Sequence, residues 1–186
     1  MPNNIIQQAV YADPENMNEP SLTWPGNLGC RFTVSVPFQV TATGPVADSG
    51  ASKSYQIVRT DSGMGVSPTR GMVAWWKNKA TYLVTTDQLG ALNRNSVAGI
   101  FKNSVTSGNH TAIQFGGPAY VQVTLASVGS VVSGDSLIPS AADNGRADRV
   151  AAGTAVTYTK IGTADGTTVA TNLILATLQL PALETT

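Results

Sequence analysis

The chain has 186 residues, of which 42% are hydrophobic and 12% are charged, with a formal net charge of zero and a pI near 6.5. This length suits one compact body with an appendage, and the hydrophobic fraction is large enough for a packed core. A neutral chain with few charges lacks the basic face that nucleic acids or anionic membranes require, so neither partner is expected.

Residues 1–30 differ in character from the rest of the chain. Prolines at positions 2, 14, 20 and 25 exclude a long helix or a central strand. The segment nevertheless carries large apolar side chains, which a purely solvated tail does not need. We predict an extended arm that lies along a partner surface, against the alternative of a frayed terminus. Its apolar residues include Ile5, Ile6, Val10, Tyr11, Leu22 and Trp24.

Residues 31–186 are predicted to form a β body. Residues 32–42 alternate apolar and polar side chains, which indicates a strand with one buried face that includes Phe32 and Val34. Pro37 indicates that this strand is an edge or is bulged there. Residues 44–54 have the composition of a loop. Further strands are predicted at 55–59, 72–76, 81–85, 97–102, 111–115, 119–125, 136–138, 155–161 and 169–180.

Turn-forming sequences separate these strands. Asn144-Gly145 and Asp165-Gly166 are typical of tight hairpins, and Gly116-Gly117-Pro118 is predicted to end one strand before the next begins. Only residues 87–95 favour a short helix, which Gly90 weakens. The expected fold is mainly β: a single β-barrel or β-sandwich domain with the extended N-terminal arm.

Few residues can carry chemistry. The single cysteine, Cys30, cannot form an intrachain disulfide and is interpreted as a small buried apolar residue, and His110 is the only imidazole. Signatures of a serine nucleophile, a phosphate loop or a zinc site are missing from the sequence. Asp143–Asp148 lacks the downstream glutamate of a calcium loop and is interpreted as a turn. We therefore predict no enzyme, no metal and no cofactor.

Compartment follows from the same sequence. The first residues contain neither the basic region nor the apolar segment of a signal peptide, and no run approaches about 18 apolar residues. We expect the protein to be made in a cytosol-like compartment.

Trp75 and Trp76 are adjacent, and neighbours in a strand point to opposite faces. Trp76 shares a face with Met72 and Ala74 and is predicted to lie in the core. Trp75 is predicted to lie on the wetter face as a contact residue for a partner. The alternative is that Trp75 only covers the surface of the barrel.

The second half of the chain resembles phage virion proteins, in particular capsid decoration (cement) proteins and related head structural proteins. The segments that carry the resemblance are 97–100 (VAGI), 108–121 (GNHTAIQFGGPAYV), 134–140 (GDSLIPS), 144–147 (NGRA), 161–164 (IGTA) and 178–181 (LQLP). The resemblance implies a small β protein on the capsid surface of a virion, made in the host cytoplasm. It also implies a homotrimer that contacts the major capsid protein.

Two other functions remain open. One is a head-fibre or tail-type β module that binds a receptor or glycan by stacking on Trp24 or Trp75. The other is an enzyme whose site is built from Asp61, Asp87, Asp135 or Asp148, since acidic pairs act by proximity in space.

Overall fold

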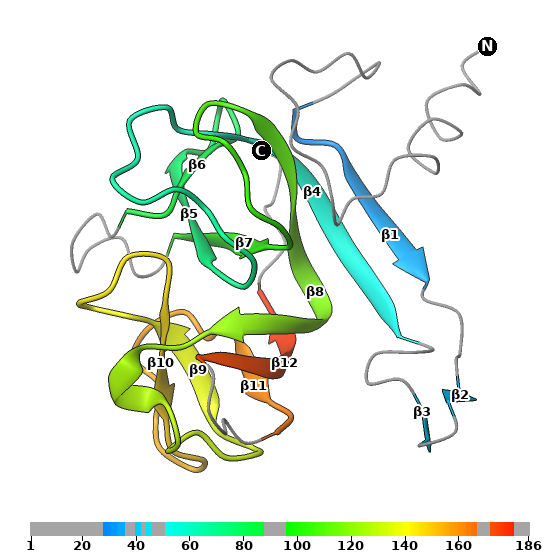
Figure 1. Cartoon of the computed structure of the whole chain (residues 1–186), viewed down its shortest axis with the longest axis vertical. Helices are drawn as coiled ribbons and strands as arrows, with labels where there is room; N and C mark the ends of the chain where they lie inside the picture. The colour runs from blue at the N-terminus through cyan, green and yellow to red at the C-terminus, as the bar shows by residue number, and fades with distance from the viewer. Residues whose placement is uncertain are drawn as a thin grey trace.

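The computed structural model describes residues 28–35, 40–41, 44–45, 51–87, 96–166 and 172–180. Its strands are β1 Arg31–Ser35, β2 Val40–Thr41, β3 Gly44–Pro45, β4 Ser52–Thr60, β5 Val73–Asn78, β6 Leu83–Thr85, β7 Val97–Phe101, β8 His110–Gln122, β9 Ser136–Pro139, β10 Ala147–Val150, β11 Gly162–Ala164 and β12 Leu173–Gln179. The helical element among these residues is one short 3₁₀ turn, η2 Leu125–Ser127 (Figure 1). The prediction of a mainly β chain with a barrel is confirmed.

Five strands close into a small barrel. Their order is β4-β6-β5-β7-β8, and β4 pairs antiparallel with β8 from Ser54 to Arg59 to complete the ring. Closure leaves these strands without free edges along the paired length. Apolar side chains fill the barrel: Val58, Met72, Ala74, Trp76, Val84, Ala98, Phe101, Val105 and Ile113.

Strand β8 leaves the barrel and begins a second unit. Its C-terminal half, Gly116–Gln122, pairs with β12, and β11, β9 and β10 follow in that order (Figure 1). Strand β10, the last in this order, returns toward the end of β8 through a parallel bridge between Val123 and Ala147. The core of this unit is aliphatic, with Val121, Leu137, Ile161, Ile174 and Leu178 among its buried side chains.

The bend in β8 depends on Gly117. This residue has a φ of +81°, and a Cβ built on it would lie 2.1 Å from the carbonyl oxygen of Ser52. Only glycine can combine that backbone angle with so close an approach of β4. The predicted strand end at Gly116-Gly117-Pro118 is therefore wrong: these residues redirect one continuous strand from the barrel into the second unit.

The predicted strand at residues 32–42 is only partly correct. The structure contains β1 and β2 there, and Pro37 lies outside the described residues. Val34, expected on the buried face, is 36% exposed. The reason is that, among the described residues, β1 ends the ten-stranded sheet and pairs only with β4, so that Phe32, stacked on Tyr55 at 5.5 Å, marks the end of its buried part.

Three smaller predictions also need correction. Residues 155–161 form no strand, and the strand follows at β11. β10 was not expected, because Asp148 and Arg149 hide its pattern. The expected loop at 44–54 contains β3 and the start of β4. Most of the expected helix, at 88–95, lies outside the described residues.

Candidate functional site

Most of the predicted interface residues belong to the N-terminal arm. Ile5, Ile6, Val10, Tyr11, Leu22 and Trp24 lie outside the described residues.

Trp75 is described, and the prediction that it lies on a wetter face is wrong because its exposed fraction is 1%. Both faces of β5 are covered. Trp76 packs in the barrel interior, whereas Trp75 packs in the cluster that includes the second unit's core. In this chain Trp75 offers no surface to a partner or a sugar.

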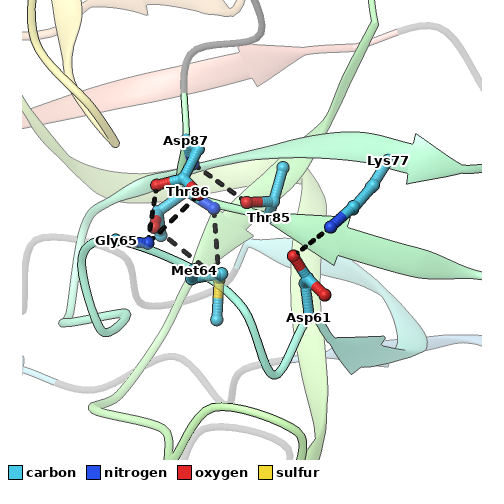
Figure 2. Close-up of polar contacts among 7 residues, drawn as sticks. All are labelled: Asp61, Met64, Gly65, Lys77, Thr85, Thr86 and Asp87. Atoms are coloured by element: carbon cyan, nitrogen blue, oxygen red, sulfur yellow. Dashed lines mark hydrogen bonds and ion pairs between the residues drawn. The ribbon is translucent and has the colours of Figure 1, made fainter.

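The loop that joins β4 to β5, residues 61–72, is held in place by polar contacts (Figure 2). Both carboxylate oxygens of Asp87 accept a hydrogen bond from the backbone N–H of Gly65, at 3.0 and 3.1 Å. The backbone N–H of Thr86 donates to Met64 Sδ at 3.3 Å, and the Thr86 hydroxyl donates to the Val66 carbonyl. The end of β6 thus fixes the middle of this loop.

Asp61 begins the loop and forms an ion pair with Lys77 of β5 (Figure 2). The hydrogen bond from the Lys77 ammonium holds the pKa of Asp61 below its ordinary value, and burial of the carboxyl works in the opposite direction. The Lys77 side chain remains 43% exposed. The ion pair therefore connects the end of β4 to β5.

Gly71 of the same loop, together with Val73 and Asp87, also joins the two units. Asn144 Nδ2 donates to Asp87 Oδ1 at 3.4 Å, and the N–H of Val73 donates to the Gly145 carbonyl at 2.8 Å. The N–H of Gln122, at the end of β8, donates to the Gly71 carbonyl at 2.7 Å. These contacts fix the second unit against the outer side of the barrel.

Asp135 and Asp148 shape the second unit. The Asp135 carboxylate is 1% exposed and accepts hydrogen bonds from the backbone N–H groups of Val132 at 3.0 Å and Ala152 at 3.1 Å. Arg149 Nε lies 3.2 Å from it. Asp148 accepts a hydrogen bond from the Thr124 hydroxyl at 2.9 Å.

The four carboxylates considered for catalysis therefore each hold backbone or side chains in place. Within the described ranges, no three His, Cys, Asp or Glu side chains are grouped so that they could hold a metal ion.

Two hollows flank the 61–72 loop. One has a volume of about 490 Å³, with five hydroxyl residues around Pro68 and Val105; its lining is Ser67, Pro68, Thr69, Ser104, Val105, Thr106 and Ser107. The other has a volume of about 390 Å³ and is lined by Val66, Met72, Leu125, Ala142, Asp143, Asn144 and Arg146. Leu125 on its rim is 74% exposed. The first hollow is uncharged, and the second combines apolar groups with one acid and one cation.

Sequence reasoning missed the free side of β1. This strand pairs with β4 on one side, and the described residues place no strand on the other. Thr33, Val34 and Ser35 are exposed. Cys30, expected to be buried, is half-buried beside this strand. The alternation of residues 32–42 is the same for an edge strand and for an inner strand with one wet face, so only Pro37 gave a signal.

No family model matches the chain, and no curated protein matches it. Among the helical residues that the structure describes, no segment has the length and apolar character needed to span a membrane.

Proposed function

We propose that this chain is a virion structural protein that binds and stabilises a phage capsid as a decoration (cement) protein. Its partners would be the major capsid protein and further copies of itself, at the capsid surface. Two observations carry the proposal. The carboxylates of Asp61, Asp87, Asp135 and Asp148 hold parts of the fold in place. In addition, the sheet has an edge at β1 that no described strand covers. Such a body is suited to work through protein contacts.

The segments that resemble virion proteins support the proposal through both units. They lie in β7 and β8 of the barrel, and in β9, β11, the end of β12 and the turn before β10 of the second unit, while Pro181 lies outside the described residues. Their glycines serve close packing: a Cβ on Gly99 would lie 2.7 Å from the Gln114 carbonyl oxygen, and one on Gly162 would lie 2.4 Å from that of Thr177. The resemblance thus rests on residues that this fold requires.

The distribution of charge supports assembly through the arm. Residues 1–27 contain Asp13, Glu15 and Glu19 and no Lys or Arg. Residues 28–186 contain eleven Lys or Arg side chains against seven Asp and one Glu. Opposite charge on arm and body favours contact between the arm of one copy and the body of another. A homotrimer built this way places Ile5, Ile6, Tyr11, Leu22 and Trp24 at subunit or capsid contacts.

Co-sedimentation with empty, undecorated phage heads tests the proposal. We expect the full chain to sediment with the heads and a chain lacking residues 1–28 to bind at least about tenfold more weakly, because a buried aromatic anchor and its neighbours are lost. Trp24→Ala should cause much of that loss. The control is Leu125→Ala, which removes an exposed apolar side chain from the body. Full chain that stays in the supernatant would rule out a decoration role.

A second function, binding of a receptor or glycan, is favoured by the hydroxyl-lined hollow. Its uncharged walls suit a neutral polyhydroxylated ligand, and it replaces the stacking platform that buried Trp75 cannot provide. Glycan-array binding that is abolished by Thr106→Val, with Val132→Ala as a control on the exposed surface, would support this function over the capsid one.

A further inference from the structure

Strand β1 has one edge that no described strand covers, and backbone groups on such an edge can pair with a further strand. Arg31–Ser35 contains no proline, and β4 is its only strand neighbour among the described residues. An exposed edge of this kind presents unpaired N–H and C=O groups, which another strand can satisfy. Natural edges are usually protected by proline, inward-pointing charge or a covering segment, and these five residues contain only Arg31 as a charged group.

The direction of the backbone groups on β1 follows from its pairing. The N–H of Ile57 donates to the Cys30 carbonyl at 2.9 Å, so alternate residues of β4 direct their groups toward β1. In the register of this pair, Phe32 lies opposite Tyr55 and Val34 lies opposite Lys53. Phe32 and Val34 therefore bond to β4, whereas the backbone groups of Arg31, Thr33 and Ser35 point away from it.

Residues 5–12, with the sequence IIQQAVYA, match this edge. They form the centre of an eleven-residue run without proline, between Pro2 and Pro14, and half of them are Ile, Val or Tyr, which favour strands. They carry no charge, and the acidic residues at 13, 15 and 19 follow them, whereas β1 begins with Arg31. Backbone pairing would give affinity, and Ile, Val and Tyr side chains would cover the exposed Val34.

We propose that residues 5–12 of a neighbouring copy add as a strand to the free edge of β1. Prolines at 14, 20 and 25 favour an extended connection over a tight return onto the same chain. The contact is heterologous, arm to edge, so a closed ring of copies satisfies every arm and every edge. This inference rests on the proposed role of the arm in assembly, but it needs no capsid.

Two variants separate arm from edge. Thr33→Pro removes an N–H that points away from β4, so it blocks the edge while β1 stays paired. Thr33→Ala is the matched control, because it loses the same side chain and keeps the N–H. Deletion of residues 1–12 removes the arm strand and leaves the edge intact. Circular dichroism and melting temperature check that each body remains folded.

Light scattering on the purified protein gives the result. We expect the full chain and Thr33→Ala to form the same closed oligomer, and Thr33→Pro and the deletion each to weaken assembly at least about tenfold. A mixture of these two variants should form a one-to-one heterodimer, because one supplies the arm and the other the edge.

Three results would overturn the inference: a monomeric full chain, wild-type assembly of both variants, or a mixture that stays monomeric, as pairing within one chain would give. Head binding is measured separately. If the two variants form the heterodimer but the full chain does not bind heads, only the decoration role is refuted. If the full chain binds heads but the two variants form no heterodimer, only the arm-to-edge contact is refuted.

Discussion

The barrel and the second unit share β8 but close in different ways. In the barrel, β4 and β8 pair continuously over Tyr55–Arg59, so a ladder of backbone hydrogen bonds seals the ring. In the second unit, closure depends on the bridge between Val123 and Ala147 and on the hydrogen bond from the Thr124 N–H to the Ala147 carbonyl, at 2.9 Å. The same strand thus belongs to one ring closed by a ladder and to another closed at a single point.

The two units also differ in what holds their cores. The barrel interior contains Trp76 and Phe101, with Tyr82 edge-on to Trp76 at 6.4 Å. The second unit has aliphatic side chains, and buried Asp135 accepts hydrogen bonds from its loops. Where the ladder is short, a carboxylate supplies the acceptors that a strand would otherwise provide. We therefore expect the second unit to open at lower free energy than the barrel.

Substitution of the adjacent tryptophans is the strongest test of this comparison. Trp75→Ala should lower the free energy of unfolding by about 3–5 kcal/mol, because it leaves a cavity where the second unit's core meets the barrel. Hydrogen exchange should then increase first in β9–β12. Trp76→Ala should have a similar total cost, with faster exchange in β4–β7 instead. Equal exchange patterns in the two variants would mean that the units open together.

Gly117→Ala tests the junction itself. The new Cβ would meet the Ser52 carbonyl oxygen at a left-handed φ, so we expect a loss of about 3 kcal/mol in the free energy of unfolding and faster exchange in both units. Gly153→Ala is a matched control, because Gly153 has the same φ of +81° and no atom within 4 Å of the added Cβ. It should cost about 1 kcal/mol, which is the backbone strain alone. Similar losses in the two variants would show that the approach of β4 is unimportant.

Asp135→Ala tests the role of the buried carboxylate. It leaves the N–H groups of Val132 and Ala152 without their acceptor, which should cost about 2 kcal/mol. Faster exchange should be confined to residues 130–152. Asp165→Ala is the control, because that exposed residue accepts one hydrogen bond, from the Thr177 hydroxyl. Faster exchange in the barrel strands would contradict a local role for Asp135.

Periodicity in the sequence was enough to predict the class of fold but not its closure. Alternation and turn residues gave most of the strands, since each signal is local. Trp75 was misplaced because β5 is covered on both faces, and that depends on β8 carrying the chain past Gly117 into a second unit. β10 was missed because Arg149 is paired with Asp135, a contact between residues distant in sequence. The arm residues, including Trp24, remain predictions.

The smallest expected effect concerns the ion pair between Asp61 and Lys77 at the start of the 61–72 loop. The pKa of Asp61 in the folded chain lies below its ordinary value of 3.8, so the ionised carboxylate contributes stability above about pH 4. That contribution is lost as the pH falls through the folded value. At pH 6, Asp61→Asn should therefore melt below the wild type by about 2–4 °C, for about 1 kcal/mol.

The difference between Asp61→Asn and the wild type should shrink at pH values below 3.8 and in high salt, because the Lys77 side chain is partly exposed. The melting temperature of Lys77→Gln should depend on pH as weakly as that of Asp61→Asn, because both variants lack the ion pair. The melting temperature of Asp165→Asn should depend on pH as that of the wild type does. A difference in melting temperature that stays constant from pH 6 to pH 2 would assign the effect of Asp61→Asn to altered packing. If the difference in melting temperature instead shrinks as expected, the 61–72 loop of the barrel gains stability from an ionised pair. The loops of the second unit, by contrast, depend on a carboxylate bonded to backbone N–H groups.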